Sequence, residues 1–388
     1  MIKLIKSTFN KEKATKDALC KFIKQSKQLS IGKMCSEFES KFSRWQGRKY
    51  SVMFNSGSSA NLALIQVLIN LKKIKEEDSV GFSAVTWATN IMPLISLKLN
   101  PIPIDIELET LNISSKKVIE AYKKNKFKFL FITNVLGYCH DIDNIKEFCK
   151  KNNILLIEDN CESLGSEYKK TKLGNFSLAS TFSFYVGHHL STIEGGMVCT
   201  DDLEIDTMLR IVRSHGMDRH LSESEQKRLR LEYKVDAFYG KFAFYDIGYN
   251  FRPTEINGFL GVNQLQYLDE MVSNREKNYK KLEKIYLNND FIKIETTGLT
   301  KISNFAFPLI CKTKNIKEKY MDIAKKTGIE IRPIVAGCIN KHAFYKKHVA
   351  TKHKLPNAET VHELGFYFGN NAEMTRDEIN TLVRVFSK

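Results

Sequence analysis

The stretch "YSVMFNSGSSANLALIQVLINL", residues 50–71, places a short apolar run, a polar turn and a long apolar segment in direct succession. The run YSVMF has the aromatic and β-branched residues typical of a strand, and the segment after the turn is long enough for a helix. From about residue 50 to 200, short runs of this kind alternate with longer amphipathic segments. This alternation predicts an α/β fold with a mostly parallel sheet.

The strands of this sheet are expected at residues 50–54, 79–83, 100–106, 129–137, 154–159, 180–184 and 196–201. Four of these runs lead into polar or glycine-containing exits, with the sequences "NSGSSAN", "AVTWATN", "DNCES" and "YVGHH". Open α/β sheets bind ligands at the carboxyl ends of their strands. We therefore expect the functional site where these exits meet.

A long charged helical pattern follows at residues 263–287 and leads into a smaller α+β region, with "FAFPLICK" and "IEIRPIV" as strands. The length of 388 residues favours two domains. We expect a large cofactor-binding domain at residues 1–261, with an N-terminal helical segment, and a small C-terminal domain at residues 262–388.

The net charge of +16 is compatible with an anionic partner. The lysines are scattered along expected helix faces, which favours a solvated surface over nucleic-acid binding. No apolar stretch approaches the roughly 18 residues of a membrane span, and no signal peptide is evident. We expect a cytoplasmic protein with no membrane or nucleic-acid partner.

The eight cysteines include no closely spaced pair, so neither a zinc ribbon nor a CxxC redox site is expected. The exit "NSGSSAN" contains Gly57, which permits a tight turn, and Ser58, which can help to place N–H groups at a helix start. Such a start suits a phosphate, although many helices begin with serine and bind nothing. No GxGxxG or GxxxxGK[ST] motif supports a dinucleotide or P-loop site.

The stretch "ILLIEDNCESLG" ends a buried strand with Glu158, Asp159 and, three residues later, Glu162. A buried carboxylate needs a cationic or hydrogen-bonding partner. Asp159 has two interpretations: it caps the next helix, or it contacts a protonated pyridine nitrogen and so keeps a pyridoxal-type ring electron-withdrawing.

Taken together, these motifs resemble the DegT-type family of pyridoxal-phosphate-dependent nucleotide-sugar aminotransferases. The likeness covers nearly the whole chain and implies the fold-type-I, aspartate-aminotransferase-like architecture. It continues through "TFSFYVGHHLSTIEGGMVCTDD", "RSHGMDR", "GYNFRPTEINGFLG" and "IEIRPIVAG".

The resemblance implies roles for residues within the matching motifs. Gly57, Ser58 and Ser183 would hold the cofactor phosphate, and Asn250 would reach it from a partner subunit. A homodimer with shared active sites is therefore expected.

The resemblance also implies that Trp87 stacks on the cofactor ring, that Asp159 meets its nitrogen and that Glu162 supports its hydroxyl side. Three further residues are candidates for binding the glutamate carboxylate or the sugar pyrophosphate, and each is equally compatible with a solvated surface charge: His215, Arg219 and Arg332.

In that family the lysine that forms the Schiff base lies five residues after the serine of "SF", a position that His188 occupies here. Three interpretations of His188 are open: catalytic base, structural histidine and metal ligand. A glycine-flanked loop is a poor core position, and His188 with His189 offers no i, i+4 chelating pair, so a catalytic base is favoured. Imidazole forms no Schiff base, so the cofactor should be bound non-covalently, as pyridoxal or pyridoxamine phosphate.

The "HH" before "EGG" and the near-terminal "FGNN" are similar to the histidine branch of the family. That resemblance implies a lyase that removes the 3-hydroxyl of a nucleotide-linked 4-keto-6-deoxy sugar, with GDP-4-keto-6-deoxy-D-mannose as the expected substrate. L-Glutamate would donate the amino group and ammonia would be released, in the biosynthesis of 3,6-dideoxyhexoses for surface polysaccharide such as the lipopolysaccharide O-antigen.

Other functions are open at this point. A related 3-dehydrase for CDP-linked sugars uses an iron–sulfur cluster, which needs about four convergent cysteines and is not expected here. An aminotransferase that acts with histidine in place of lysine, or a catalytically silent sugar-nucleotide-binding relative, would show a different product or none.

Overall fold

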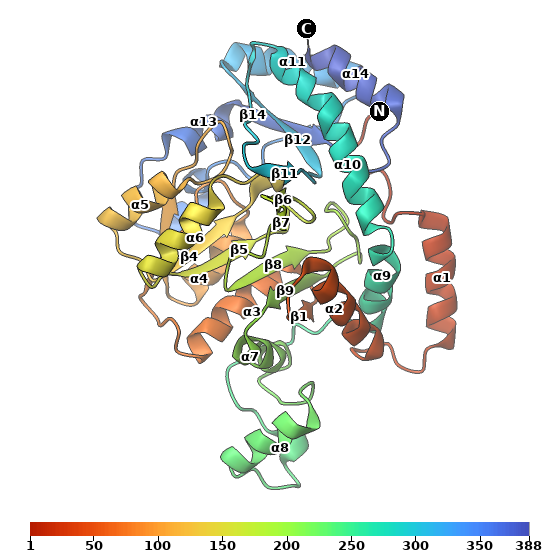
Figure 1. The fold of residues 1–388 in the computed structure, drawn as a ribbon, viewed down its shortest axis with the longest axis vertical. Coiled ribbons are helices and arrows are strands. Elements are labelled where there is room, and N and C mark those ends of the chain that lie inside the picture. Colours follow the sequence, from red (N-terminus) through yellow and green to blue (C-terminus); the bar gives the residue numbers. More distant parts are fainter. Residues whose placement is uncertain (388) are drawn as a thin grey trace.

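The computed structural model describes residues 1–387 and has a seven-stranded sheet at its centre (Figure 1). In spatial order the strands are β1 Tyr50–Phe54, β9 Gly196–Thr200, β8 Ala179–Ser183, β5 Leu155–Asp159, β4 Phe129–Thr133, β2 Ser79–Ser83 and β3 Asn100–Ile104. Strand β9 pairs antiparallel with both β1 and β8, whereas the other neighbours pair in parallel. The prediction of an α/β fold with a mostly parallel sheet is confirmed.

Helices cover both faces of this sheet. In β4, Phe129 and Phe131 join one apolar core, while Leu130 and Ile132 join another on the opposite face, because successive side chains of a strand alternate. Burial on both faces explains why the parallel strands are apolar without alternation. The helices around the sheet are α2 Lys33–Gln46, α3 Gly57–Asn70, α4 Met92–Ser96, α5 Ser115–Lys124, α6 Ile142–Lys151 and α7 Leu203–Arg213.

The C-terminal part has a second, antiparallel sheet. Its order is β10 Phe291–Ile292, β12 Ala306–Cys311, β14 Gly365–Gly369 and β13 Ile331–Arg332. The strands expected from "FAFPLICK" and "IEIRPIV" are present as β12 and β13, and β14 was not anticipated. The helices of this region and of the N-terminus are α1 Glu12–Gln25, α9 Glu255–Leu265, α10 Leu268–Leu282, α11 Lys314–Thr327, α12 Ala343–His348, α13 Pro356–Leu364 and α14 Arg376–Phe386.

A small third sheet joins β11 Leu299–Lys301 to the hairpin of β6 Glu167–Tyr168 and β7 Thr171–Lys172. It links a loop after β5 to the C-terminal half of the chain. The division into domains at residues 1–261 and 262–388 stays a prediction.

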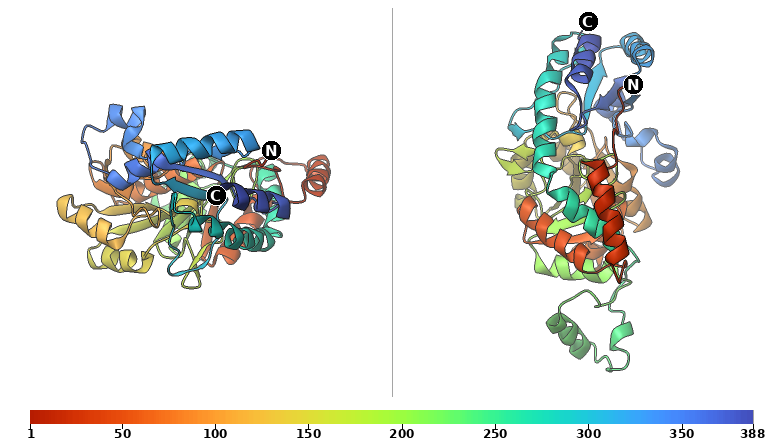
Figure 2. Two further views of the ribbon diagram at one scale, coloured as in Figure 1. Left: turned by 90° about the horizontal axis from the view of Figure 1, so that it is seen from above. Right: turned by 90° about the vertical axis from the view of Figure 1, so that its right-hand side faces the viewer.

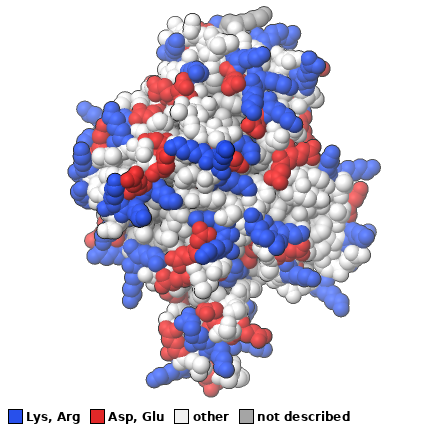
Figure 3. Space-filling model, viewed as in Figure 1, with Lys and Arg blue, Asp and Glu red and all other residues white. Residues whose placement is uncertain are grey.

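Residues 218–247, which we call the arm, project from the body of the molecule and carry α8 Glu223–Glu232 (Figures 1 and 2). On the face drawn in Figure 3, Lys and Arg side chains are mixed with acidic ones rather than gathered in one stripe. Among residues 1–387, no helix combines the length and the apolar character needed to span a membrane.

Candidate active site

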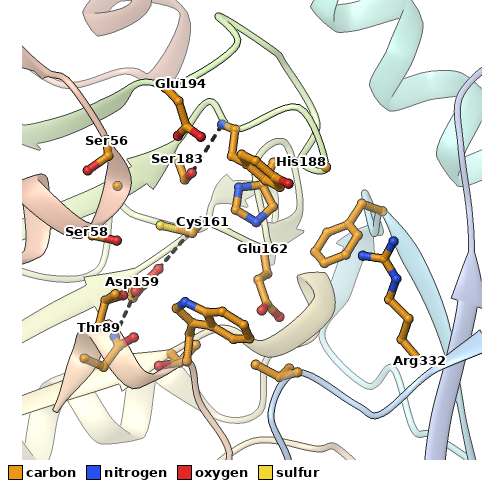
Figure 4. A pocket seen from close by; sticks show the side chains of 18 of the residues that line it. Ser56, Ser58, Thr89, Asp159, Cys161, Glu162, Ser183, His188, Glu194 and Arg332 are labelled. Atoms are coloured by element: carbon orange, nitrogen blue, oxygen red, sulfur yellow. Dashed lines mark hydrogen bonds between the residues drawn. The ribbon is translucent and has the colours of Figure 1, made fainter. Parts of the chain in front are cut away.

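The exits of four strands meet around a cavity of about 320 Å³ (Figure 4). The cavity is lined by Ser56, Gly57 and Ser58 after β1, Trp87, Thr89 and Asn90 after β2, Asp159, Cys161 and Glu162 after β5, and Ser183, Tyr185, Gly187 and His188 at the end of β8 and beyond. Phe305, Arg332 and Tyr367 line it from the C-terminal part. The cavity therefore brings together the predicted residues Gly57, Ser58, Trp87, Asp159, Glu162, Ser183, His188 and Arg332.

Helix α3 begins at the cavity wall and rests directly on the end of β8. The Ser56 side chain accepts a hydrogen bond from the Ser59 N–H at 3.0 Å and so caps the helix. A Cβ atom on Gly57 would lie 2.7 Å from the Cβ of Ser183, a separation that only glycine avoids. The N–H groups of the first helical turn have no partner within the helix, and with the Ser58 and Ser183 hydroxyls they suit a phosphate.

Asp159 ends β5 with its carboxylate buried at the cavity. Its Oδ2 accepts hydrogen bonds from the side-chain amides of Asn61 at 3.0 Å and Asn90 at 2.8 Å, and its Oδ1 accepts one from the Cys161 N–H at 2.9 Å. No lysine or arginine of residues 1–387 forms an ion pair with it. A turn follows in place of the helix that Asp159 would cap, so the carboxylate remains free to meet a cationic ring nitrogen.

The adjacent Glu158 points away from this site. Its carboxylate accepts hydrogen bonds from Asn134, Gly174, Phe176 and Ser177, and it is fully buried. Glu158 is therefore a structural residue, and the two neighbouring carboxylates of β5 have different tasks.

Glu162 lies across the cavity from Asp159. Burial raises the pKa of Glu162 to about 8, the Leu136 N–H that donates to its Oε2 at 3.0 Å opposes this, and the Asp159 charge adds to it. Glu162 is therefore largely protonated at neutral pH, and it can donate a hydrogen bond to an anionic ring oxygen.

His188 lies on the glycine-flanked loop after β8 and points between Ser183 and Glu162 (Figure 4). Its ring is half-buried, with the Phe305 ring centroid 5.5 Å away. Burial lowers the pKa of His188 to about 4; the Asp159 carboxylate opposes this shift and the Arg275 guanidinium adds to it. His188 is therefore neutral at physiological pH, the form in which an imidazole acts as a base.

Three predicted residues lie outside the cavity lining, at the base of the arm: His215, Arg219 and Asn250. The Asn250 side chain accepts a hydrogen bond from Arg252 at 3.0 Å, and Arg219 packs over the Phe242 ring at 5.4 Å. Arg332 is at the cavity rim, where two of its nitrogens contact Oε1 of Glu330.

The sequence reasoning missed the residues that orient Asp159 and those that come from the C-terminal sheet. Asn61 lies one helical turn after Gly57, and Asn90 ends the quoted "AVTWATN", so the spacing of polar residues after strands was an available signal. Phe305 and Tyr367 follow no strand of the large sheet, and no local pattern indicates that they reach the cavity.

The cavity fits pyridoxal phosphate in three ways: a helix start for the phosphate, a buried carboxylate for the ring nitrogen, and Trp87, exposed at the cavity, for a ring face. No lysine is among its lining residues within the described chain, so the cofactor has no amine to bond to there. Within residues 1–387 no cluster of three or more His, Cys, Asp or Glu is placed to hold a metal ion.

Replacing Asp159 with Asn should weaken pyridoxal phosphate binding at least about tenfold, because a charged partner of the ring nitrogen is lost. The matched control is Glu158→Gln, which should lower the free energy of unfolding by about 1–3 kcal/mol without changing cofactor affinity. Absorbance titration and urea unfolding measure the two effects. Equal cofactor affinity in the wild type and Asp159→Asn would contradict the assignment.

The cofactor-free protein should lose stability as the pH rises towards 8, because Glu162 binds its proton more tightly in the folded state than in the unfolded state. The comparison with Glu162→Gln isolates this group, because every other titratable group is present in both proteins. The wild type should lose roughly 1–2 kcal/mol relative to that variant between about pH 6.5 and 8. If urea unfolding gives the wild type and Glu162→Gln the same change in the free energy of unfolding over this pH range, Glu162 is not protonated in the folded protein.

Comparison with known proteins identifies the family of the chain. Residues 10–387 match the model of the DegT/DnrJ/EryC1/StrS aminotransferase family. The chain is 33% identical to the GDP-4-keto-6-deoxy-D-mannose 3-dehydratase of Escherichia coli O55:H7 over 93% of each chain. It is 34% identical to the enzyme of that name from Yersinia pseudotuberculosis, over 94% of this chain and 93% of the relative.

A solved GDP-4-keto-6-deoxymannose-3-dehydratase with a trapped PLP-glutamate geminal diamine superposes with a TM-score of 0.90 at 31% identity, covering 100% of both chains. With a family match over nearly its whole length and relatives above 30% identity, the chain belongs to the DegT/DnrJ/EryC1/StrS aminotransferase family.

Proposed function

We propose that this protein removes the 3-hydroxyl of a nucleotide-linked 4-keto-6-deoxy sugar, with GDP-4-keto-6-deoxy-D-mannose as substrate. The reaction consumes L-glutamate and gives the 4-keto-3,6-dideoxy sugar, 2-oxoglutarate and ammonia. It is balanced, because the oxygen that the sugar loses equals the one gained when glutamate becomes 2-oxoglutarate and ammonia. The two electrons that reduce C3 come from glutamate.

The observation that carries this proposal is a neutral imidazole in a cavity whose described lining contains no lysine. A lysine amine at this position would bond to the cofactor aldehyde and assist the transfer of an amino group from glutamate to the sugar. His188 can move protons but cannot form that bond, which favours elimination over transfer.

Pyridoxal phosphate, when bound, supplies an aldehyde that accepts the amino group of glutamate and a ring that withdraws electrons. The chain's own groups do the rest. Gly57 and Ser58 at the start of α3, with Ser183 at the end of β8, would bind the phosphate, and Asp159 would hold the ring nitrogen. Trp87 covers one face of the ring, and protonated Glu162 donates to the ring oxygen.

His188 would take up the proton that the cofactor's reactive carbon gives up and pass it to the 3-hydroxyl, whose C–O bond breaks so that it leaves as water. The lowered pKa of His188 keeps the imidazole in the unprotonated, proton-accepting form and favours the return of the proton, while the nearby Asp159 charge stabilises the imidazolium that forms. General acid–base help of this kind contributes about 10²- to 10⁴-fold in rate.

L-Glutamate is the proposed donor, in line with the glutamate adduct in the solved relative. Arg332 at the cavity rim is well placed to bind a carboxylate or a pyrophosphate. His215 and Arg219 are proposed for the same anionic groups, from a second subunit. The expected cytoplasmic location and the role in surface polysaccharide stay predictions.

We also propose a homodimer in which Asn250 of one subunit reaches the phosphate site of the other. The arm supports this, because it exposes seven large apolar side chains: Leu231, Tyr233, Phe238, Tyr239, Phe242, Phe244 and Ile247. Monomeric proteins rarely leave so many apolar groups together on the surface. Residues 215, 219 and 250 lie at the base of this arm, so an arm that packs on a second copy carries them towards it.

His188→Gln should lower the rate of dehydration at least about 100-fold, because Gln is no base, and should leave cofactor binding nearly unchanged. The assay supplies pyridoxal phosphate, glutamate and a panel of 4-keto-6-deoxy nucleotide sugars, and products are identified by mass. A deoxy sugar with ammonia supports dehydration. An amino sugar as the wild-type product would identify an aminotransferase, and no product with any sugar would favour a silent relative.

Replacing Phe238, Tyr239 and Phe242 together with Ser should convert the protein to monomers, because the apolar surface for a second copy is lost. Light scattering after gel filtration measures the mass. Leu287→Ser is the control, since Leu287 is 83% exposed, like Phe238 at 82%, but lies outside the arm. A monomeric wild type, or a triple variant that remains dimeric, would contradict the proposed interface.

A further inference from the structure

The second histidine of the "HH" pair has no part in the proposed mechanism. His189 is 3% exposed, and its Nε2 lies 2.6 Å from the carbonyl oxygen of Ser303. A carbonyl oxygen can only accept, so Nε2 must carry the proton and Nδ1 must be the unprotonated nitrogen. Nδ1 is buried and has no hydrogen-bond partner among the described residues.

The surroundings of His189 oppose a positive charge. Burial lowers the pKa of His189 well below its ordinary value, and the Arg275 guanidinium on α10 and the neighbouring His188 push in the same direction, against the Ser303 carbonyl. Arg275 is 5% exposed, forms no ion pair within the described chain, and has its own pKa lowered by burial to about 10, so it stays charged. The other charged group at this place is Glu373, which is exposed at the rim.

His189 and Arg275 line a chamber of about 40 Å³ behind the loop. The buried Nε of Arg275, a donor, and the buried Nδ1 of His189, an acceptor, both have no partner in the described chain. Both groups can hydrogen-bond to water, and the chamber is large enough to hold a water molecule. The chamber therefore fits a neutral His189 and does not fit an imidazolium.

The hydrogen bond from His189 to Ser303 connects the loop after β8 to the segment that leads into β12 of the second sheet. Ser303 is itself fixed, since its N–H donates to the Ser166 hydroxyl at 2.9 Å. Two residues further on, the Phe305 ring lies 5.5 Å from the His188 ring and 6.0 Å from the His189 ring. A shift of His189 would move both the backbone of His188 and the aromatic ring against which His188 packs.

We propose that His189 is the positioning residue of this site: by donating a hydrogen bond to the Ser303 carbonyl it ties the loop to the second sheet and thereby fixes the His188 ring in the cavity. The proposal rests on the role of His188 in the proposed function. It assigns to His189 no contact with substrate or cofactor.

The test compares His189→Phe, which keeps a ring but loses the hydrogen bond, with His189→Gln, whose amide can donate to Ser303. In His189→Phe, kcat for dehydration should fall about 10- to 100-fold with little change in KM, because the base is misplaced. The acidic limb of its pH profile should move to higher pH, since a looser loop admits water and restores the ordinary pKa of His188. His189→Gln should recover most of the rate.

The matched control is His342→Phe. His342 makes the same kind of bond, from Nε2 to the Ala336 carbonyl at 2.7 Å, but does not line the cavity. The His342→Phe variant should lose about as much free energy of unfolding as His189→Phe, but its kcat and its pH profile should match those of the wild type. Wild-type kcat and an unmoved pH profile in His189→Phe would overturn the proposal, as would a His342→Phe variant with the same kinetic losses.

A separate readout keeps this test independent of the proposed activity. In protein labelled with ¹⁵N-histidine, the His189 signals, assigned from their loss in His189→Gln, should show a neutral ring with the proton on Nε2 from about pH 5 to 8. Titration of His189 within that range, or a proton on Nδ1, would refute the assignment. If the wild type makes no deoxy sugar, the proposed function fails, and the NMR result still decides the state of His189.

Discussion

A buried negative charge at the end of a central strand organises the active site. The Asp159 carboxylate is held by two side-chain amides and one backbone N–H, and no lysine or arginine among residues 1–387 forms an ion pair with it. The amides come from α3 and from the short helix η1 Ala88–Asn90, so the exits of β1 and β2 are both oriented towards the exit of β5. A ring with a protonated nitrogen that binds here would supply the positive charge that Asp159 lacks, at the point where the polar exits of the strands converge.

Much of the fold follows from local sequence, because short apolar runs between amphipathic segments leave few alternatives to a mostly parallel sheet. Strands β1 and β2 have the predicted bounds, whereas β4 ends at Thr133, before the predicted residue 137, and Leu136 beyond it adopts a φ of 50°. The strand β14 was missed because its short run, "GFYFG", is defined by pairing with β12 rather than by its own pattern.

The site could be predicted where its residues follow parallel strands, because the carboxyl ends of such strands must meet. Phe305, Tyr367 and Arg275 could not be found in this way. They reach the loop of His188 and His189 only through the packing of the second sheet and α10 against the first, and this long-range geometry has no local signature. The roles given to His215, Arg219 and Asn250 depend in addition on a second subunit.

An imidazole at position 188, where the family resemblance implies a Schiff-base lysine in the aminotransferases, changes what the same cavity can do. The residues proposed to hold the phosphate and the ring would serve any member of the family, but a group that moves protons without bonding to the cofactor would leave the aldehyde free. Burial lowers the pKa of that imidazole and keeps it neutral. In our proposal, the hydrogen bond from His189 to Ser303 keeps it positioned. In this account the type of reaction changes through the residue at position 188, while the residues proposed to bind the cofactor remain the same.

The most direct test of this account is whether the cofactor is attached to the chain. The purified protein is incubated with pyridoxal phosphate and treated with borohydride, which makes any Schiff base to a lysine permanent, and the mass of the denatured 44.7 kDa chain is measured. The account predicts an unmodified mass, with the reduced cofactor free in solution. A mass increase of one cofactor, mapped to a single lysine, would contradict it.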